Sequence, residues 1–212
     1  MFVIVDYKVG NIKNVISSFK RLGFDPFVSG DPDIIKKADV VILPGVGAFS
    51  DAMDSLRRTG IAEAIKYRHN NKLFTIGICL GMQVLFDKSY EDGEFDGLGI
   101  LSGEFRKFDL ADTDLKVPHM GWNNLVIKRG DPLVANLEAD DYVYFVHSYY
   151  LKNYKEENLL AYTNYGDLVP AIVRDKNTIG IQFHPEKSSN VGEKLLVNIK
   201  NIIDNEMDNS SK

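Results

Sequence analysis

The stretch Leu73-Phe74-Thr75-Ile76-Gly77-Ile78-Cys79-Leu80-Gly81 decides the fold. Its apolar first part is typical of a strand that is buried on both faces of a sheet. The residues from Leu80 to Asp87 then predict a helix. Two glycines flank Cys79, and they permit a sharp strand-to-helix turn because glycine has no Cβ atom to clash. The stretch therefore predicts a cysteine at the end of a buried strand, directly before a helix.

The rest of the first half shows the same alternation of strands and helices. Apolar runs at Phe2–Val5 and Val40–Leu43 predict buried strands, and a short strand is expected near Asp25–Val28. Helical spacing of apolar residues follows Asn11, a suitable N-cap, and recurs across residues 53–65. Strands that alternate with helices predict an α/β fold with a mostly parallel central sheet, covered by helices on both faces.

In the second half, strand-like runs separated by turn residues predominate. They are Phe105–Phe108, Leu125–Lys128, Tyr142–Val146, Leu159–Thr163, Ala171–Arg174 and Thr178–Phe183. Asp175-Lys176-Asn177 predicts a hairpin turn between the last two. A final helix is expected from Val191 to Ile203. We therefore expect one domain over residues 1–212, with an antiparallel extension of the sheet and a frayed polar tail at 204–212.

Composition excludes several classes of protein. A hydrophobic content of 44% in 212 residues argues against disorder, and a net charge of -5 does not suggest a nucleic-acid binder. No apolar run approaches the ~18 residues of a membrane span. The single cysteine excludes an intrachain disulfide and a multi-cysteine metal site. We expect a cytoplasmic protein without metal, cofactor, nucleic-acid partner or membrane partner.

The segment around Cys79 has the spacing of the G-x-S-x-G nucleophile elbow, with sulfur in place of oxygen. The N-terminus of the following helix favours negative charge, which suits a thiolate nucleophile. The alternative is a structural cysteine, because free cysteine is among the most buried residue types. The elbow alone leaves both interpretations open.

A cysteine nucleophile needs a base, and the chain has four histidines. His69 lies in a polar run and is expected in a solvated loop. His119 and His147 lie in or beside strands, where a structural histidine is the commoner outcome. His184 follows the apolar strand that ends at Phe183.

His184 is the best candidate base because of the two residues after it. Pro185 favours an extended backbone at His184, so Glu186 can lie on the same face as the histidine. A carboxylate beside an imidazole fixes its tautomer and stabilises the imidazolium. The sequence therefore predicts His184 as the base and Glu186 as the group that orients it.

A second glycine-containing strand end, Pro44-Gly45-Val46-Gly47, follows Val40–Leu43. In a parallel sheet it is expected at the same edge as Cys79. Its backbone N–H groups can then face a developing oxyanion. The alternatives are an ordinary turn and a phosphate loop, although the absence of Gly-Lys-Ser/Thr argues against the latter.

Together, Gly77-Ile78-Cys79-Leu80-Gly81-Met82-Gln83 and His184-Pro185-Glu186 resemble the class I, or triad, glutamine amidotransferases. Further segments resemble the glutaminase subunits of imidazole glycerol phosphate synthases within that family. They are Pro44-Gly45-Val46-Gly47-Ala48-Phe49, Pro118-His119-Met120-Gly121-Trp122-Asn123, Tyr144-Phe145-Val146-His147-Ser148-Tyr149 and Gln182-Phe183-His184-Pro185-Glu186-Lys187-Ser188. The resemblance covers nearly the whole chain.

This resemblance implies a flavodoxin-like amidotransferase sandwich that hydrolyses glutamine to glutamate and ammonia through a triad of Cys79, His184 and Glu186. It also implies a heterodimer with a (β/α)8-barrel synthase subunit. The barrel would use the ammonia to make imidazole glycerol phosphate and aminoimidazole carboxamide ribotide in histidine biosynthesis. Lys8 and Ser189 depart from the usual family pattern, which leaves open a related amidotransferase of surface-sugar biosynthesis.

The resemblance also implies roles for individual residues. The oxyanion N–H groups would come from Val46 and Leu80, the contacts to L-glutamine from Gly47, Gln83, Glu91, Ser148 and Tyr149, and the contacts to the barrel from Asn11, Asn14, Trp122, Tyr144 and Lys187. Each has an ordinary alternative. Gln83 can cap a surface, Glu91 can be a solvated charge, the two aromatic residues can be core residues, and Lys187 can be a surface lysine.

Two other classes of protein share parts of this pattern. A cysteine hydrolase or peptidase of similar fold also has an elbow, but the pairing of Gln83 with Glu91 fits a free amino acid better. A flavin-binding module has the same kind of sheet, but Tyr7-Lys8-Val9-Gly10-Asn11 replaces the expected Ser/Thr- and Gly-rich loop.

Overall fold

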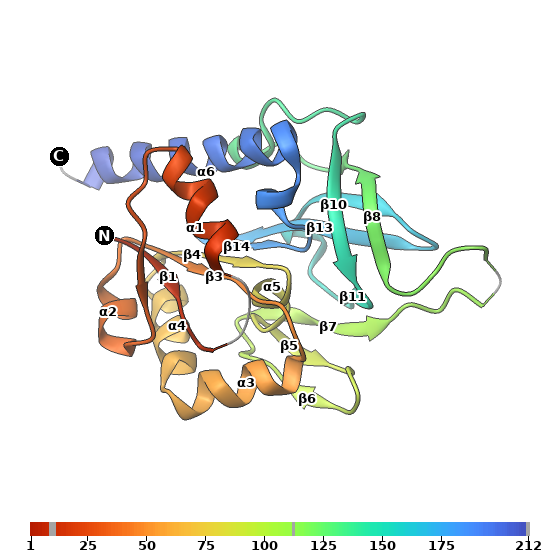
Figure 1. The fold of residues 1–212 in the computed structure, drawn as a ribbon, viewed down its shortest axis with the longest axis horizontal. Coiled ribbons are helices and arrows are strands. Elements are labelled where there is room, and N and C mark those ends of the chain that lie inside the picture. The colour runs from red at the N-terminus through yellow and green to blue at the C-terminus, as the bar shows by residue number, and fades with distance from the viewer. Residues whose placement is uncertain (9–11, 112, 211–212) are drawn as a thin grey trace.

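An eight-stranded sheet forms the centre of the computed structural model, which describes residues 1–8, 12–111 and 113–210 (Figure 1). Its strands are β1 (Phe2–Val5), β2 (Phe27–Ser29), β3 (Val40–Leu43), β4 (Phe74–Ile78), β9 (Val126–Ile127), β12 (Leu159–Asn164), β13 (Leu168–Asp175) and β14 (Thr178–Ile181). The order is β2-β1-β3-β4-β14-β13-β12-β9. The first five strands in this order are parallel, and the last three extend the sheet with antiparallel pairs. The predicted mostly parallel sheet with an antiparallel extension is confirmed.

Helices cover both faces of this sheet (Figure 1). One face carries α1 (Ile12–Arg21) and α6 (Ser189–Ser210), and the other carries α2 (Pro32–Lys37), α3 (Phe49–Arg58) and α4 (Ile61–Asn70). Successive residues of β1 point to opposite faces. Phe2 and Ile4 join the core under α1 and α6, whereas Val3 and Val5 join the core under the other three helices. Burial on both faces explains why β1 and β3 are continuous apolar runs.

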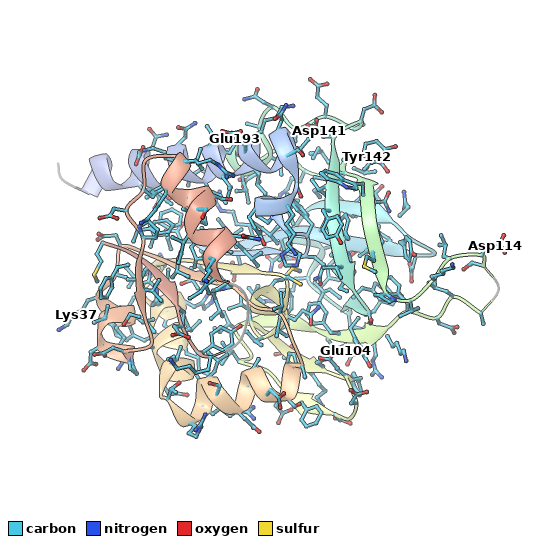
Figure 2. All side chains as sticks on the ribbon, in the orientation of Figure 1. Lys37, Glu104, Asp114, Asp141, Tyr142 and Glu193 are labelled. Carbon is cyan, nitrogen blue, oxygen red and sulfur yellow. The ribbon has the colours of Figure 1, made fainter. Side chains whose placement is uncertain are left out.

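Two smaller sheets lie beside the carboxyl edge of the main sheet. One has the order β11-β7-β5-β6, and the other is a two-stranded ribbon of β8 and β10. Their bounds are β5 (Phe86–Ser89), β6 (Phe95–Asp96), β7 (Leu101–Lys107), β8 (His119–Asn124), β10 (Tyr142–His147) and β11 (Tyr149–Lys152). Only Ser148 separates β10 from β11, so the chain passes from the ribbon to the other sheet at this bend. The loop between β7 and β8, which carries Asp114, projects away from both (Figure 2).

The helix predicted from Leu80 to Asp87 was too long. Helix α5 covers only Leu80–Gln83, and β5 begins at Phe86. The Leu98 N–H donates to the Val84 carbonyl, and the Leu101 N–H donates to the Leu85 carbonyl. These carbonyl groups bind a neighbouring segment and are not left for further helical hydrogen bonds.

The predicted solvated loop around His69 was also wrong. This segment is the last turn of α4, where Arg68 is fully buried and His69 is half-buried. The Arg68 guanidinium donates to the carbonyl groups of Ile35, Ala38 and Phe74. Tertiary carbonyl partners of this kind leave no local signal in the sequence.

Other element boundaries also differ from the predictions. Helix α2 and strands β5, β6, β8 and β11 were not predicted, although Asp31 caps α2 by accepting from the Asp33 and Ile34 N–H groups. Helix α6 is longer than the predicted Val191–Ile203, since it begins at Ser189 and extends to Ser210. Three short 3-10 helices cover Pro132–Val134, Glu156–Asn158 and Pro185–Lys187. Among the described residues, no helix is long and apolar enough to cross a membrane.

Candidate active site

The order of the central strands brings three sequence segments to one edge of the sheet. Strands β3, β4 and β14 are neighbours and parallel, so their carboxyl ends lie side by side. These ends lead into Pro44–Gly47, Cys79 and His184. The parallel pairing therefore places the predicted nucleophile between the predicted oxyanion loop and the predicted base.

Cys79 occupies the turn between β4 and α5 in a strained backbone conformation, with φ 54° and ψ -114°. Residues other than glycine rarely adopt a positive φ, and such strain persists only where surrounding contacts fix it. The Cys79 N–H donates to the Ile181 carbonyl at 2.7 Å, and its carbonyl accepts from the Met82 and Gln83 N–H groups at 2.9 and 3.1 Å. These hydrogen bonds hold the elbow on both sides.

The glycines of the elbow are required by close backbone approach. A Cβ atom on Gly77 would overlap the Gly81 carbonyl, and one on Gly81 would overlap the Leu43 carbonyl. Both obstacles are backbone atoms, which cannot rotate away as a flexible side chain can. The strand-to-helix turn therefore packs against itself and against β3.

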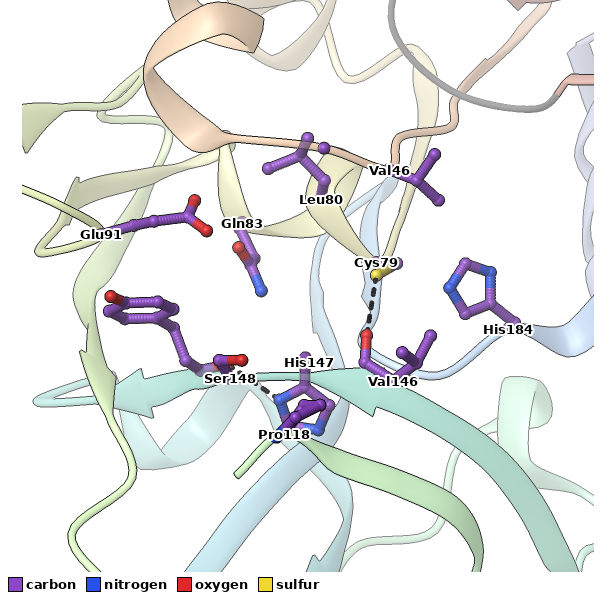
Figure 3. Close-up of a pocket in the computed structure, with 12 residues that line it drawn as sticks. Val46, Cys79, Leu80, Gln83, Glu91, Pro118, Val146, His147, Ser148 and His184 are labelled. Carbon is purple, nitrogen blue, oxygen red and sulfur yellow. Dashed lines mark hydrogen bonds between the residues drawn. The ribbon is translucent and has the colours of Figure 1, made fainter. Parts of the chain in front are cut away.

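His184 and Glu186 form the pair that the sequence predicts. The His184 Nδ1 atom lies 2.8 Å from Glu186 Oε1, and both side chains are buried. A carboxylate accepts, so Nδ1 carries a proton and Nε2 is the atom that can react. Nε2 is buried without a hydrogen-bond partner among the described residues, and Figure 3 shows the ring beside the Cys79 sulfur. This is the geometry of a nucleophile, a base and an orienting carboxylate.

Electrostatics favour the charged form of His184. Burial by itself lowers the pKa of this imidazole, but the neighbouring Cys79 and Glu186 outweigh burial and raise the pKa to about 10. An imidazolium is therefore available at neutral pH to stabilise a thiolate and to give a proton to a leaving group.

A pocket of about 340 Å³ opens in front of Cys79 (Figure 3). Its lining residues are Val46, Gly47, Cys79, Leu80, Gln83, Glu91, Pro118, Val146, His147, Ser148, Tyr149 and His184. The lining includes all the residues assigned by resemblance to the oxyanion and glutamine sites. Sequence reasoning missed Pro118, Val146 and His147, although they lie within the segments that carry the resemblance.

Glu91 and Gln83 have contacts that exclude their ordinary alternatives. Glu91 is half-buried, and its Oε2 atom accepts from the Phe49 N–H at 2.7 Å. Burial raises the pKa of this carboxyl. Gln83 is buried, and its Nε2 atom donates to Gln182 Oε1 at 3.3 Å. Neither residue is therefore a solvated surface group.

The loop Pro44–Gly47 is held at its beginning. The buried Tyr7 hydroxyl donates to the Pro44 carbonyl at 2.5 Å. Val46, two residues later, is 41% exposed and lines the pocket. Leu80 is the first residue of α5, where backbone N–H groups have no partner within the helix. The two predicted oxyanion donors thus belong to neighbouring segments that both line the pocket (Figure 3).

The family model for class I glutamine amidotransferases matches residues 3–202. The chain belongs to this family. It is therefore a glutamine-hydrolysing enzyme, and its mixed α/β fold is the fold of this family. A solved glutamine amidotransferase superposes with a TM-score of 0.74 at 20% identity, covering 96% of this chain and 99% of the other.

Two bacterial relatives are more similar in sequence to this amidotransferase than the solved structure is. Imidazole glycerol phosphate synthase subunit HisH of Carboxydothermus hydrogenoformans is 48% identical, over 96% of this chain and 100% of the relative. The protein of the same name from Lactococcus lactis is 48% identical, over 92% of this chain and 95% of the relative. The similarity thus extends over almost the full length of both chains.

The residues assigned to partner contacts lie partly together. The rings of Trp122 and Tyr144 meet edge to face at 6.1 Å, and Lys187 Nζ lies 5.8 Å from the centre of the Tyr144 ring. Trp122 is 51% exposed, so it is not a core residue. Asn14 is exposed on α1, and Asn11 lies outside the described residues.

The described residues contain no group of three or more His, Cys, Asp or Glu side chains that could hold a metal ion. The chemistry that the described site supports is acyl transfer through the cysteine.

Proposed function

We propose that this amidotransferase is the glutaminase subunit of an imidazole glycerol phosphate synthase. It would hydrolyse L-glutamine and pass the ammonia to a (β/α)8-barrel synthase subunit. The observation that carries the proposal is the convergence of Cys79 and the His184–Glu186 pair on one pocket. The two full-length relatives named as subunits of this synthase favour it over an amidotransferase of surface-sugar biosynthesis.

Catalysis begins when the Cys79 sulfur attacks the side-chain amide carbon of glutamine. The Val46 and Leu80 N–H groups bind the resulting oxyanion, and His184 Nε2 gives its proton to the leaving ammonia. A thioester then remains on Cys79. His184 takes a proton from water, the water attacks the thioester, and glutamate leaves. Glu186 keeps the imidazole in the required orientation throughout.

The rest of the pocket recognises a free amino acid. Glu91 is the carboxylate in the lining, and it is assigned to the α-ammonium group of glutamine. Ser148 and Tyr149 lie on another wall, where their backbone is assigned to the α-carboxylate. Gly47 and Gln83 complete the contacts to the substrate. A carboxylate for the α-ammonium group and backbone groups for the α-carboxylate, at fixed separation, fit glutamine better than they fit a peptide.

The outer face of the β8–β10 ribbon is a suitable surface for the barrel. Met120, Trp122 and Tyr142 are each at least 51% exposed, and Figure 2 shows Tyr142 at the start of β10. Aromatic residues and Met are enriched where proteins meet. Ammonia in water becomes ammonium, which is not a nucleophile, so a buried path into the partner is required. We propose that the complex works in the cytoplasm, because the Cys79 nucleophile must stay reduced.

The complex with the barrel subunit tests this function. We expect Cys79→Ala to abolish glutamine-dependent synthesis while ammonia-dependent synthesis continues, because only the ammonia source is lost. His69→Asn is a matched control, since His69 contacts Thr178 and lies outside the pocket lining. Glutamine use by the pure Cys79→Ala complex would refute the assignment. We also expect little glutaminase activity without the barrel, and high activity that the barrel does not change would contradict this.

A further inference from the structure

Two buried histidines beside the pocket have no step in the reaction. His147 lines the pocket, and its Nδ1 atom lies 2.8 Å from the Tyr149 carbonyl oxygen. Its Nε2 atom lies 3.2 Å from Nδ1 of His119, on the neighbouring strand β8. The Nε2 atom of His119 lies 3.4 Å from Nδ2 of Asn123. The two rings thus form a chain of contacts that ends at the pocket wall.

The chemistry of the partners fixes the direction of every hydrogen bond in this chain. A carbonyl only accepts, so Nδ1 of His147 donates, and Nε2 of a neutral His147 must accept from Nδ1 of His119. The remaining nitrogen of His119 then accepts from the Asn123 amide. The same Nδ2 atom donates to the Asn164 carbonyl at 3.1 Å, and Asn123 Oδ1 accepts from the Asn124 N–H at 2.9 Å. The amide is therefore oriented as the chain requires.

This series of hydrogen bonds forms only when both imidazoles are neutral, because an added proton would place two N–H groups face to face. The aromatic residues Phe108, Phe145 and Tyr165 pack against the pair. Tyr165 is stacked on His119, and Cys79, His184 and the carboxylate of Glu91 line the same pocket as His147. Of these pocket groups, His184 acts on His147 and lowers its pKa further. Burial lowers the pKa of His119 to about 4 and that of His147 to about 3.

The hydrogen bond between His147 and the Tyr149 carbonyl, at the end of this series, spans the bend at Ser148. His147 binds the carbonyl of the residue two positions later, so its ring closes the turn through which β10 passes into β11. The Phe108 N–H donates to the Ser148 carbonyl at 3.2 Å and fixes the same bend from the other side. Ser148 and Tyr149 form the pocket wall at this point.

We propose that His147 and His119 are positioning residues, which hold the Ser148–Tyr149 wall in the shape that binds the α-carboxylate of glutamine. This rests on the proposed function, since it assigns these two residues to the substrate. Both ring nitrogens of His147 are engaged, so it is not a second base. Its contribution is to substrate binding, and it leaves the chemical step to His184.

Two substitutions at position 147 separate positioning from packing. The side-chain amide of Asn lies where His has Nδ1, so His147→Asn keeps a donor for the Tyr149 carbonyl. The amide of Gln lies where His has Nε2, so His147→Gln keeps the contact to His119 and loses the contact to the wall. In the complex, we expect His147→Gln to raise KM for glutamine about tenfold, as the loss of a buried hydrogen bond does, with kcat within about twofold. We expect His147→Asn to have a KM close to the wild-type value.

The substitutions His119→Asn and His119→Gln make the same comparison at the next histidine of the hydrogen-bonded series. We expect Gln again to raise KM more than Asn does, with a smaller difference. This second comparison replaces the first if His147→Gln does not fold. Thermal melting and ammonia-dependent synthesis report folding and partner binding. Equal KM values for the Asn and Gln variants would overturn positioning in favour of packing, and a collapse of kcat at unchanged KM would overturn it in favour of catalysis. Failure of the proposed function would instead appear as a wild-type complex that does not use glutamine.

Discussion

Glu91 is predicted to act on both substrate and protein, and two substitutions can separate these actions. Its Oε2 atom binds the Phe49 N–H at the start of α3, while the carboxylate lines the pocket. Ala48, the N-cap of α3, makes no side-chain cap hydrogen bond, so Glu91 supplies the cap from another segment. Glu91→Gln keeps an oxygen for Phe49 but loses the charge, whereas Glu91→Ala loses both.

The expected magnitudes follow from these contacts. A hydrogen bond between charged groups contributes roughly 1.5–3 kcal/mol, and the half-buried position of Glu91 favours the lower end. With tenfold for every ~1.4 kcal/mol, Glu91→Gln should raise KM for glutamine about 10- to 30-fold. Loss of the helix cap costs about 1 kcal/mol more in Glu91→Ala. Because α3 follows the oxyanion loop, we expect this second loss to lower kcat about fivefold.

The assay compares glutamine with glutaramate, which has the same amide and carboxylate but no α-ammonium group. For the complex, Glu91→Gln should leave the KM for glutaramate unchanged, since the lost charge has no partner there. Glu91→Ala should still lower kcat for glutaramate. Glu94→Gln is the matched control, because Glu94 lies in the same loop and pairs with Lys88 at the surface.

The reasoning is refuted if Glu91→Gln raises KM equally for glutamine and glutaramate, because the charge would then have no specific role toward the ammonium group. Identical kcat values for Glu91→Gln and Glu91→Ala on glutaramate would refute the capping role alone.

Three further predictions concern the loop, the partner surface and pH. Tyr7→Phe leaves the buried Pro44 carbonyl without its donor, so we expect the free energy of unfolding, measured with denaturant, to fall by roughly 1–3 kcal/mol and kcat to fall as well. An unchanged kcat would show that Tyr7 does not hold the oxyanion loop in its active position. Lys187→Ala should weaken barrel binding or lower the ammonia yield per glutamine, as measured by titrating the barrel subunit against the variant and the wild type. If Lys187 is an ordinary surface residue, the free energy of binding should change by no more than about 0.5 kcal/mol. His119 and His147 have folded-state pKa values of about 4 and 3, below the usual ~6.5, so the unfolded chain binds more protons below pH 6.5. Stability should therefore fall as pH drops from 6.5 toward 4, and the double variant His119→Asn/His147→Asn should show a shallower slope; equal slopes would contradict neutral buried imidazoles. His184 acts in the opposite sense, because its raised pKa gives stability that is complete below pH 6.5 and lost as pH rises toward about 10.

The local pattern of the sequence predicted the elbow and the His184–Glu186 pair, because each of these features is formed by residues that are close together in the sequence. The elbow around Cys79 depends on neighbouring glycines, and Glu186 lies two residues from His184 on the same face. The apolar runs predicted β1, β3 and β4, since a strand buried on both faces is mostly apolar. Adjacent parallel strands then place their carboxyl ends at one edge.

Contacts between distant segments were decided only by the tertiary structure. Glu91 appears in the sequence as one acid in an acidic loop, yet its carboxylate caps a helix 42 residues away. His119 and His147 appear as unrelated strand histidines until the pairing of β8 with β10 places them opposite each other. Arg68 and His69 look solvated until α4 is packed against the sheet. The physical reason is that a polar side chain in a sequence does not reveal its partner, whereas the regular spacing of apolar residues reveals which face of a helix or strand must be buried.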